Sequence, residues 1–227
     1  MSKLIVGNWK MNGDLSLVDV FLDGFRDIDV VIAFPSIFTA YACQRATGAL
    51  KIAAQDCSIY DDFGAHTGEI SAKMLRAAGV QHVIVGHSER RASCSASDTI
   101  QHVFKKLQNV IANDMTAILC VDENFHQLLN EETLRLLNHA AERIIVAYEP
   151  ISAIGTGHIP ALAEIAAVIA KIKLLTPSSK ILYGGSVSAS SAGSLFSSPS
   201  IDGCLIGGAS LSPAELLRIY KASHVLC

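Results

Sequence analysis

The 227-residue sequence predicts a single-domain α/β protein in which eight parallel strands close into a (β/α)8 barrel. The main observation is an alternation, repeated eight times, of a short apolar run and a segment whose apolar residues recur at helical spacing. The strand-like runs are apolar throughout, which is typical of parallel strands buried on both faces. No linker or change of composition divides residues 1–227, and eight such units in a chain of this size favour a closed barrel over an open, doubly wound sheet.

The first four strand–helix units carry recognisable stop signals. Pro35 ends the second strand, and Gly79 stands where the C-terminal cap of a helix is expected. Apolar residues at helical spacing, such as Ile100, Phe104 and Leu107, define the buried faces of the helices. The predicted strands are residues 3–9, 29–34, 50–55 and 82–86, and the predicted helices are residues 15–26, 36–45, 70–78 and 98–113.

The last four units follow the same pattern. Pro177 ends the helix before the seventh strand, and Ser212-Pro213 is a typical helix start. The serine-rich stretch 186–200 leaves room for only a short helix. The predicted strands are residues 116–121, 144–147, 180–183 and 201–206, and the other predicted helices are residues 126–140, 161–175 and 214–222.

The composition indicates a globular protein without membrane, nucleic-acid or metal partners. Half of the residues are hydrophobic, 17% are charged, and no apolar run approaches the ~18 residues that a membrane-spanning helix needs. The net charge of −3 and the scattered Lys and Arg give no basic surface for nucleic acid. The six cysteines and eight histidines match no zinc-binding spacing, and the N-terminus lacks the pattern of a signal peptide. We therefore expect a cytoplasmic protein with reduced cysteines.

Polar and glycine-rich segments all follow predicted strands. Because the C-terminal ends of parallel barrel strands open on one rim, segments far apart in the sequence are expected to meet there. Two glycine-rich loops on consecutive strands, the second leading into a helix, could bind a phosphate through their backbone N–H groups. The segments are Lys10 after the first strand, His87 and Glu89 after the fourth, Glu149 after the sixth, Gly184 to Ser186 after the seventh, and Gly207 to Ser210 after the eighth.

Each of these residues also has an ordinary structural interpretation. Glu149 and Lys10 could be solvated charges at strand ends, His87 a hydrogen-bonded strand-end histidine, and a lone Gly-Gly pair a turn. Their expected convergence at one rim favours function instead. The residues thus indicate an enzyme for a small phosphorylated molecule, with a carboxylate, an imidazole and an ammonium at the reacting end.

Six motifs along the chain resemble the triosephosphate isomerase family, in that family's order. The resemblance implies a TIM barrel that interconverts dihydroxyacetone phosphate and D-glyceraldehyde 3-phosphate, an isomerase step of glycolysis and gluconeogenesis. No cofactor or metal is implied, because the proton moves between adjacent carbons of one substrate. The motifs are Asn8-Trp9-Lys10, Gly86-His87-Ser88-Glu89-Arg90-Arg91, Tyr148-Glu149-Pro150, Ala153-Ile154-Gly155-Thr156-Gly157, Tyr183-Gly184-Gly185-Ser186-Val187 and Gly207-Gly208-Ala209-Ser210.

The resemblance also implies a role for each site residue. Glu149 is the general base that takes a proton from the carbon beside the carbonyl, His87 polarises the carbonyl and moves protons between the two oxygens, and Lys10 faces the negative charge. The family is itself the standard example of this catalytic set and of a closing lid. The supporting residues are Asn8 and Glu89, which orient Lys10 and His87; Gly155, Ser186, Gly207 and Gly208, which bind phosphate; Ile154 and Leu205, which form an apolar clamp on Glu149; and Tyr183 and Ser186, which latch the lid, Ala153 to Gly157.

The sequence departs from the family pattern at several positions. The lid hinges read Pro150-Ile151-Ser152 and His158-Ile159-Pro160, and Asp122 stands where a glycine is usual. The segment 64–69 resembles the family's intersubunit loop, with His66 in place of an aromatic residue. It implies a homodimer in which Thr67 supports the partner's Lys10, although an ordinary surface loop is the alternative.

Two other functions remain open from the sequence alone. The barrel could act on another small sugar phosphate or amino-sugar phosphate, because the phosphate loops would serve either substrate. The chain could also be a non-catalytic binding or adhesion protein on an isomerase scaffold. Such a protein is expected to lose catalytic residues first, and Lys10, His87 and Glu149 are all present.

Overall fold

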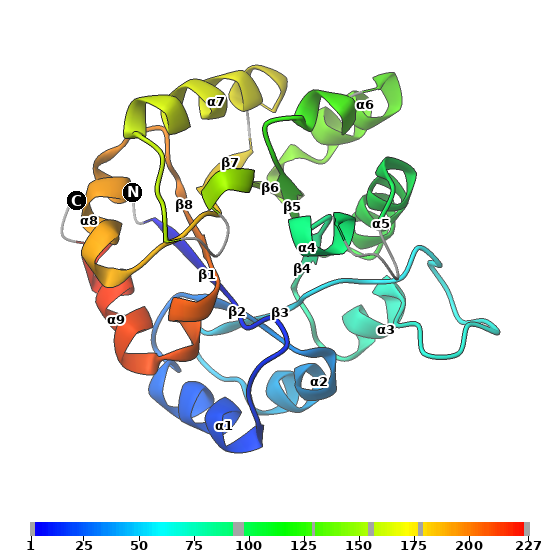
Figure 1. Ribbon diagram of the computed structural model, residues 1–227. Helices are drawn as coiled ribbons and strands as arrows, with labels where there is room; N and C mark the ends of the chain where they lie inside the picture. The colour runs from blue at the N-terminus through cyan, green and yellow to red at the C-terminus, as the bar shows by residue number, and fades with distance from the viewer. Residues whose placement is uncertain (1–2, 93–97, 129, 154–156, 177–178, 225–227) are drawn as a thin grey trace.

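Eight parallel strands close into a barrel in the computed structural model, which describes residues 3–92, 98–128, 130–153, 157–176 and 179–224 (Figure 1). Each strand pairs with its neighbours in sequence, and β1 closes the barrel by pairing with β8. The predicted (β/α)8 fold is therefore confirmed. The strands are β1 (Leu4–Asn8), β2 (Val31–Phe34), β3 (Lys51–Ala54), β4 (His82–Val85), β5 (Thr116–Val121), β6 (Ile144–Tyr148), β7 (Lys180–Tyr183) and β8 (Gly203–Ile206).

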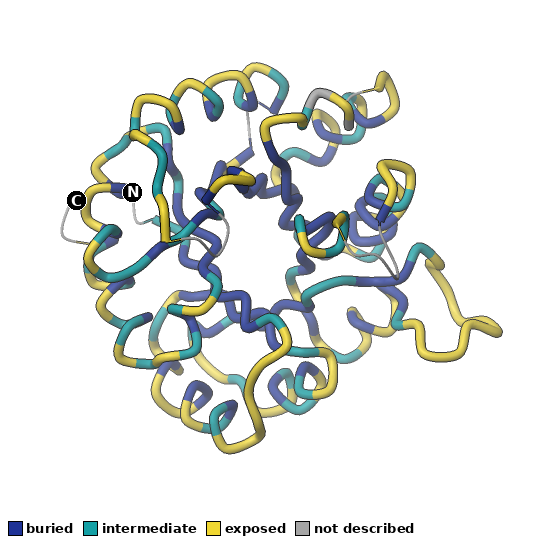
Figure 2. Tube along the Cα trace, viewed as in Figure 1, coloured by how far each residue is buried: buried dark blue, intermediate teal, exposed yellow. Residues whose placement is uncertain are grey.

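Alternate residues of the strands fill the barrel and face the helices around it. In β1, Val6 lies in register with Val31 of β2 and with Leu205 of β8, and the side chains of all three belong to the cluster inside the barrel. A larger apolar cluster, which includes Trp9, Phe21 and Phe34, lies between strands and helices. Figure 2 shows the buried strands at the centre and helices that are buried on their inner side only. This arrangement explains why the strand sequences are apolar on both faces, with polar residues mainly at the strand ends.

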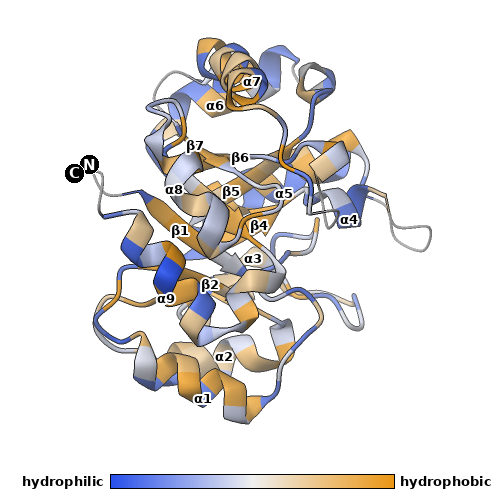
Figure 3. Ribbon diagram, turned by 60° about the vertical axis from the view of Figure 1, so that its left-hand side comes forward, coloured by the Kyte–Doolittle hydropathy of each residue, from blue (hydrophilic) through white to orange (hydrophobic). Residues whose placement is uncertain are grey.

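The helices surround the barrel, and Figure 3 shows that each carries both hydrophobic and hydrophilic residues. Side chains of Asp14, Ser71, Thr99 and Ser212 accept backbone N–H groups at helix starts, and Gly79 ends α3 with φ +95°. The helices are α1 (Leu15–Gly24), α2 (Ser36–Arg45), α3 (Ala72–Ala77), α4 (Ser88–Arg91), α5 (Ile100–Ala112), α6 (Glu131–His139), α7 (Leu162–Leu175), α8 (Ala189–Ser197) and α9 (Pro213–Ala222).

Two local predictions differ from the structure. The segment predicted as one helix over 126–140 is divided into a 3-10 turn, η1 (Phe125–Leu128), and α6, because Asn130 caps α6 by accepting the N–H of Thr133. The short helix α4 was not expected from the sequence. Its four residues are too few to show a helical repeat of apolar residues.

The loops after the strands open on one rim of the barrel. The longest described loop joins β3 to α3 and projects away from the barrel (cyan in Figure 1). We call residues 59–69 the arm; all of them except Ile59 are exposed. Over the described ranges, no helix is both long and apolar enough to cross a membrane.

Candidate active site

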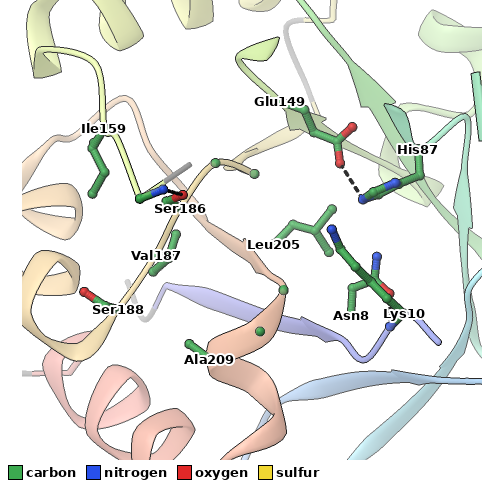
Figure 4. Close-up of a pocket in the computed structure, with 15 residues that line it drawn as sticks. Asn8, Lys10, His87, Glu149, Ile159, Ser186, Val187, Ser188, Leu205 and Ala209 are labelled. Atoms are coloured by element: carbon green, nitrogen blue, oxygen red, sulfur yellow. Dashed lines mark hydrogen bonds and ion pairs between the residues drawn. The ribbon is translucent and has the colours of Figure 1, made fainter. Parts of the chain in front are cut away.

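A cleft of about 340 Å³ lies at the C-terminal ends of the strands (Figure 4). Loops after five strands contribute to it, and it includes most of the residues predicted to form the site. Lys10, His87 and Glu149 point toward one another across its deep end, and the glycine-rich loops line the rest. The lining residues are Asn8, Lys10, His87, Glu149, Gly157, Ile159, Gly184 to Ser188, Leu205, and Gly207 to Ala209.

Glu149 is held by backbone and side-chain contacts at the end of β6. Its N–H donates to the carbonyl of Val121 at 2.8 Å, which fixes its backbone against β5. One carboxylate oxygen, Oε2, accepts the N–H of Ser88 at 3.0 Å, and the other, Oε1, lies 3.1 Å from His87 Nε2. The residue is only 1% exposed, so its carboxylate is poorly hydrated and is held by these two contacts.

His87 is oriented by the first turn of α4. Its Nδ1 accepts the backbone N–H of Glu89 at 3.2 Å, as the N-cap of that helix. Because an acceptor nitrogen cannot carry the proton, the neutral imidazole has its N–H at Nε2, which faces Glu149. The Nε2–H of His87 is therefore directed at Oε1 of Glu149.

Lys10 adopts a left-handed backbone conformation, with φ +54°. The side chain of Asn8 accepts its N–H at 3.0 Å, and Nε2 of Gln55 donates to its carbonyl at 2.9 Å. Its ammonium lies 2.6 Å from Oε1 of Glu89. Asn8 and Glu89 thus both contact Lys10, and so does Gln55, which the sequence reasoning missed. Gln55 directly follows β3, so the strand-end pattern that selected the other residues could also have selected it.

The two glycine-rich loops face each other across the wide end of the cleft. Ser186 Oγ accepts the N–H of Gly157 at 3.0 Å and donates to the carbonyl of Ala153 at 2.7 Å, so it joins both ends of the predicted lid. Gly207 and Gly208 lie at the start of the turn η4 (Gly208–Leu211). Both glycines line the cleft, where backbone N–H groups of such a loop can bind an anion.

Parts of the predicted lid lie outside the described residues. Ile154 and Gly155 are among them, so their predicted roles stay predictions. Tyr183 lies fully buried beneath the loop after β7, and burial raises the pKa of its hydroxyl to about 12. The hydroxyl therefore keeps its proton at neutral pH.

An apolar side chain, Leu205, lines the cleft beside the charged groups. Leu205 lies between Glu149 and Lys10 in Figure 4 and is 3% exposed. Cys120 is buried close to Glu149, and burial, aided by that carboxylate, raises the pKa of its thiol far above the usual range. Cys120 is therefore an uncharged thiol.

A second network of charges supports the loops beside the cleft. The ammonium of Lys106 is buried and lies 2.8 Å from carboxylate oxygens of both Asp56 and Asp98. Arg90 of α4 also contacts Asp56, at 2.9 Å. Burial raises the pKa of Asp56, and the charge of Lys106 opposes that effect. The network joins α4, α5 and the loop after β3, and no local sequence pattern predicts these pairings.

The arm carries Thr67 outside the cleft. Thr67 is exposed, and the rings of Tyr60 and His66 stack beside it with centroids 3.4 Å apart. Phe63 and Met11 are also exposed, at 71% and 96%. A further cavity of about 580 Å³ separates the arm from α4 and includes Lys10, Glu89 and Lys106 among its lining residues.

Comparison with known proteins gives a consistent result over the whole chain. A family model described as Triosephosphate isomerase matches residues 3–223. Proteins named triosephosphate isomerase from Francisella tularensis subsp. holarctica and Francisella philomiragia are each 35% identical, over 100% of this chain and 99% of their own length. One from Paracidovorax citrulli is 36% identical over 97% of this chain and 98% of its own length.

The relatives are somewhat longer than this chain. The alignment with the Francisella tularensis protein runs to 254 positions against 227 residues here. Family match, barrel and site geometry agree: the chain belongs to the triosephosphate isomerase family.

Proposed function

We propose that the protein interconverts dihydroxyacetone phosphate and D-glyceraldehyde 3-phosphate through an enediolate. The observation that carries the proposal is the meeting of Glu149, His87 and Lys10 at one end of a cleft whose other end is lined by glycine-rich loops. Membership of the family supports the same substrate. The whole chain, residues 1–227, is then one catalytic domain, and a glycolytic role and a cytoplasmic location follow from this activity.

In the proposed reaction, Glu149 removes a proton from the carbon beside the carbonyl and returns it to the neighbouring carbon. A carboxylate can do so when it is near the carbon and poorly hydrated, and Glu149 is 1% exposed. His87 donates its Nε2 proton to the carbonyl oxygen and takes up the proton of the adjacent hydroxyl. Both protons therefore stay within the substrate and two side chains, which is why no cofactor is needed.

The remaining residues bind and enclose the substrate. Lys10 stabilises the negative oxygen and the phosphate, and Asn8 and Glu89 hold it in place. Gly155, Ser186, Gly207 and Gly208 donate to the phosphate. Closure of the lid brings Ile154 over Glu149 opposite Leu205, Tyr183 and Ser186 hold the lid shut, and the exclusion of water protects the enediolate.

Steady-state turnover of glyceraldehyde 3-phosphate in a coupled assay tests the proposal. Glu149→Asp and His87→Gln are expected to lower kcat about 10²- to 10⁴-fold, the range for loss of a positioned acid or base. Glu142→Gln, an exposed carboxylate before β6, serves as the control and should leave kcat unchanged. Wild-type turnover no faster than that of the two site variants would refute the proposal. Other small sugar phosphates, assayed in parallel, test the alternative that the barrel acts on a different sugar phosphate.

We also propose a homodimer built around the arm. Exposed large hydrophobic side chains follow the first three strands, and a second copy of the chain would cover them. They are Met11, Tyr60 and Phe63 in loops and Ile37 in the first turn of α2. The 580 Å³ cavity beside Lys10 would receive the partner's arm, with Thr67 supporting Lys10. Light scattering at assay concentration checks this: a monomer with full activity would refute it.

A further inference from the structure

Arg91 and Asp122 form an ion pair beside the cleft that has no part in the chemistry proposed above. Arg91 is the last residue of α4, and Asp122 directly follows β5. The guanidinium Nη1 lies 2.6 Å from Oδ2 of Asp122, and the two side chains are 22% and 11% exposed. Such a pair is well shielded from solvent. Asp122 stands where the family pattern has a glycine.

Both partners of this ion pair are fixed by further hydrogen bonds. Nε of Arg91 donates to the carbonyl of Gly86 at 2.8 Å, so the guanidinium bridges the ends of β4 and β5. Oδ1 of Asp122 accepts the N–H of Asn124 at 2.7 Å, which orients the carboxylate. Because each charged group has two directed contacts, the pair sets a defined distance between the two strand ends.

The two strand ends carry the reacting groups. Gly86 immediately precedes His87, and α4 supplies the N–H groups that orient the imidazole and bind the carboxylate of Glu149. Val121, directly before Asp122, accepts the backbone N–H of Glu149. A helix of four residues is not stable by itself, so α4 depends on contacts such as this ion pair.

The neighbouring carboxylate is engaged elsewhere. Glu123 Oε1 lies 3.4 Å from the hydroxyl of Tyr148, and Oε2 lies 3.5 Å from the N–H of Ile151 at the start of the lid hinge. Among the described residues, Asp122 is the carboxylate that pairs with Arg91. Removal of Asp122 would thus leave a largely buried guanidinium without its anion.

We propose that Arg91 and Asp122 are positioning residues for the isomerisation. Their ion pair fixes the turn that orients His87 relative to the strand end that anchors Glu149. This inference rests on the proposed function. It predicts an effect on kcat without an effect on substrate binding, because neither side chain lines the cleft.

Asp122→Asn tests the inference, because it removes the charge and keeps an oxygen for the N–H of Asn124. We expect kcat to fall about tenfold, with KM within about twofold of wild type, as for a small misplacement of reacting groups. Asp114→Asn is the matched control: Asp114 pairs with Arg143 at 2.8 Å near the opposite end of β5 and is exposed. The control should keep the wild-type kcat.

The 15N shifts of the His87 imidazole give a readout independent of turnover. In Asp122→Asn, the separate Nδ1 and Nε2 resonances should move toward each other as the hydrogen bond from Glu89 loosens. If this variant does not fold, Arg91→Lys, which keeps the charge but loses the contact with Gly86, should give the same shift. Wild-type kcat with unchanged imidazole resonances would overturn the proposal, and so would a loss of activity that only follows the fraction of folded protein. Wild-type protein without triose phosphate activity would instead refute the proposed function. In that case the imidazole resonances would still show whether the Arg91–Asp122 pair orients His87.

Discussion

Gly184→Ala is expected to disturb the general base without changing any charge. A Cβ at position 184 would lie 2.9 Å from Cγ of Glu149 and 3.3 Å from the carbonyl oxygen of Tyr148. Carbon atoms pack at about 3.5–4.0 Å, so the side chain of Glu149 has to withdraw by roughly 0.5–1 Å. Misplacement of a reacting group by about 1 Å can lower the rate about 100-fold. We therefore expect kcat to fall between about 10-fold and 100-fold, or about 1.4–2.8 kcal/mol in activation free energy.

Steady-state kinetics in both reaction directions measure this effect, with circular dichroism to confirm folding. KM should stay within about threefold of wild type, because the phosphate-binding N–H groups are unchanged. Gly193→Ala is the control, since a Cβ there meets no heavy atom within 4 Å and the residue lies within α8. A Gly184→Ala enzyme with wild-type kcat would show that the contact between position 184 and the Glu149 side chain does not limit the reaction.

Three further predictions concern pH dependence, positioning and stability. Burial, together with the charge of Lys51, lowers the pKa of His82 to about 4, below the ordinary value of 6.5, so the fold favours the neutral ring. The contribution of His82 to the free energy of unfolding is therefore constant above pH 6.5 and is lost as the pH falls toward 4, by on the order of 2 kcal/mol at pH 5. Urea unfolding at fixed protein concentration measures this loss, which should be absent in His82→Gln. Gln55→Ala removes the donor to the carbonyl of Lys10, so kcat/KM should fall about tenfold, and an unchanged value would refute the role of Gln55. Lys106→Met leaves the buried Asp98 without its cation and Asp56 with Arg90 alone, so it should lower the free energy of unfolding by about 3–5 kcal/mol. Lys105→Met, at an exposed neighbouring position, should change the free energy of unfolding by less than about 0.5 kcal/mol.

The strands were predictable because each is a run of apolar residues with a clear end. β5 and β7 have the predicted bounds, and Gly79 and Ser212-Pro213 mark a helix end and a helix start as expected. The rule that parallel strands end on one rim was enough to bring Lys10, His87 and Glu149 together. Local sequence patterns therefore carry most of the information on fold and on the position of the catalytic groups.

Contacts between distant side chains were not predictable in the same way. Asp56, Asp98 and Lys106 are spread over some fifty residues, and nothing in their local sequence states which charge meets which. The bond from Gln55 to Lys10 depends on the geometry of two loops and on the unusual backbone of Lys10. Such pairings depend on three-dimensional packing, so one sequence could suggest the residues but not their partners.

The left-handed backbone of Lys10 makes position 10 a site where the residue best for stability differs from the residue needed for activity. A residue with a Cβ is strained at φ +54°, at a cost of about 1–2 kcal/mol, and glycine would relieve that strain. Laboratory selection of this barrel for heat resistance alone should then favour glycine at position 10, and the selected proteins should be inactive. Lysine at this position can persist only where turnover itself is selected, which makes residue 10 an indicator of whether an evolving copy of the gene still works as an enzyme.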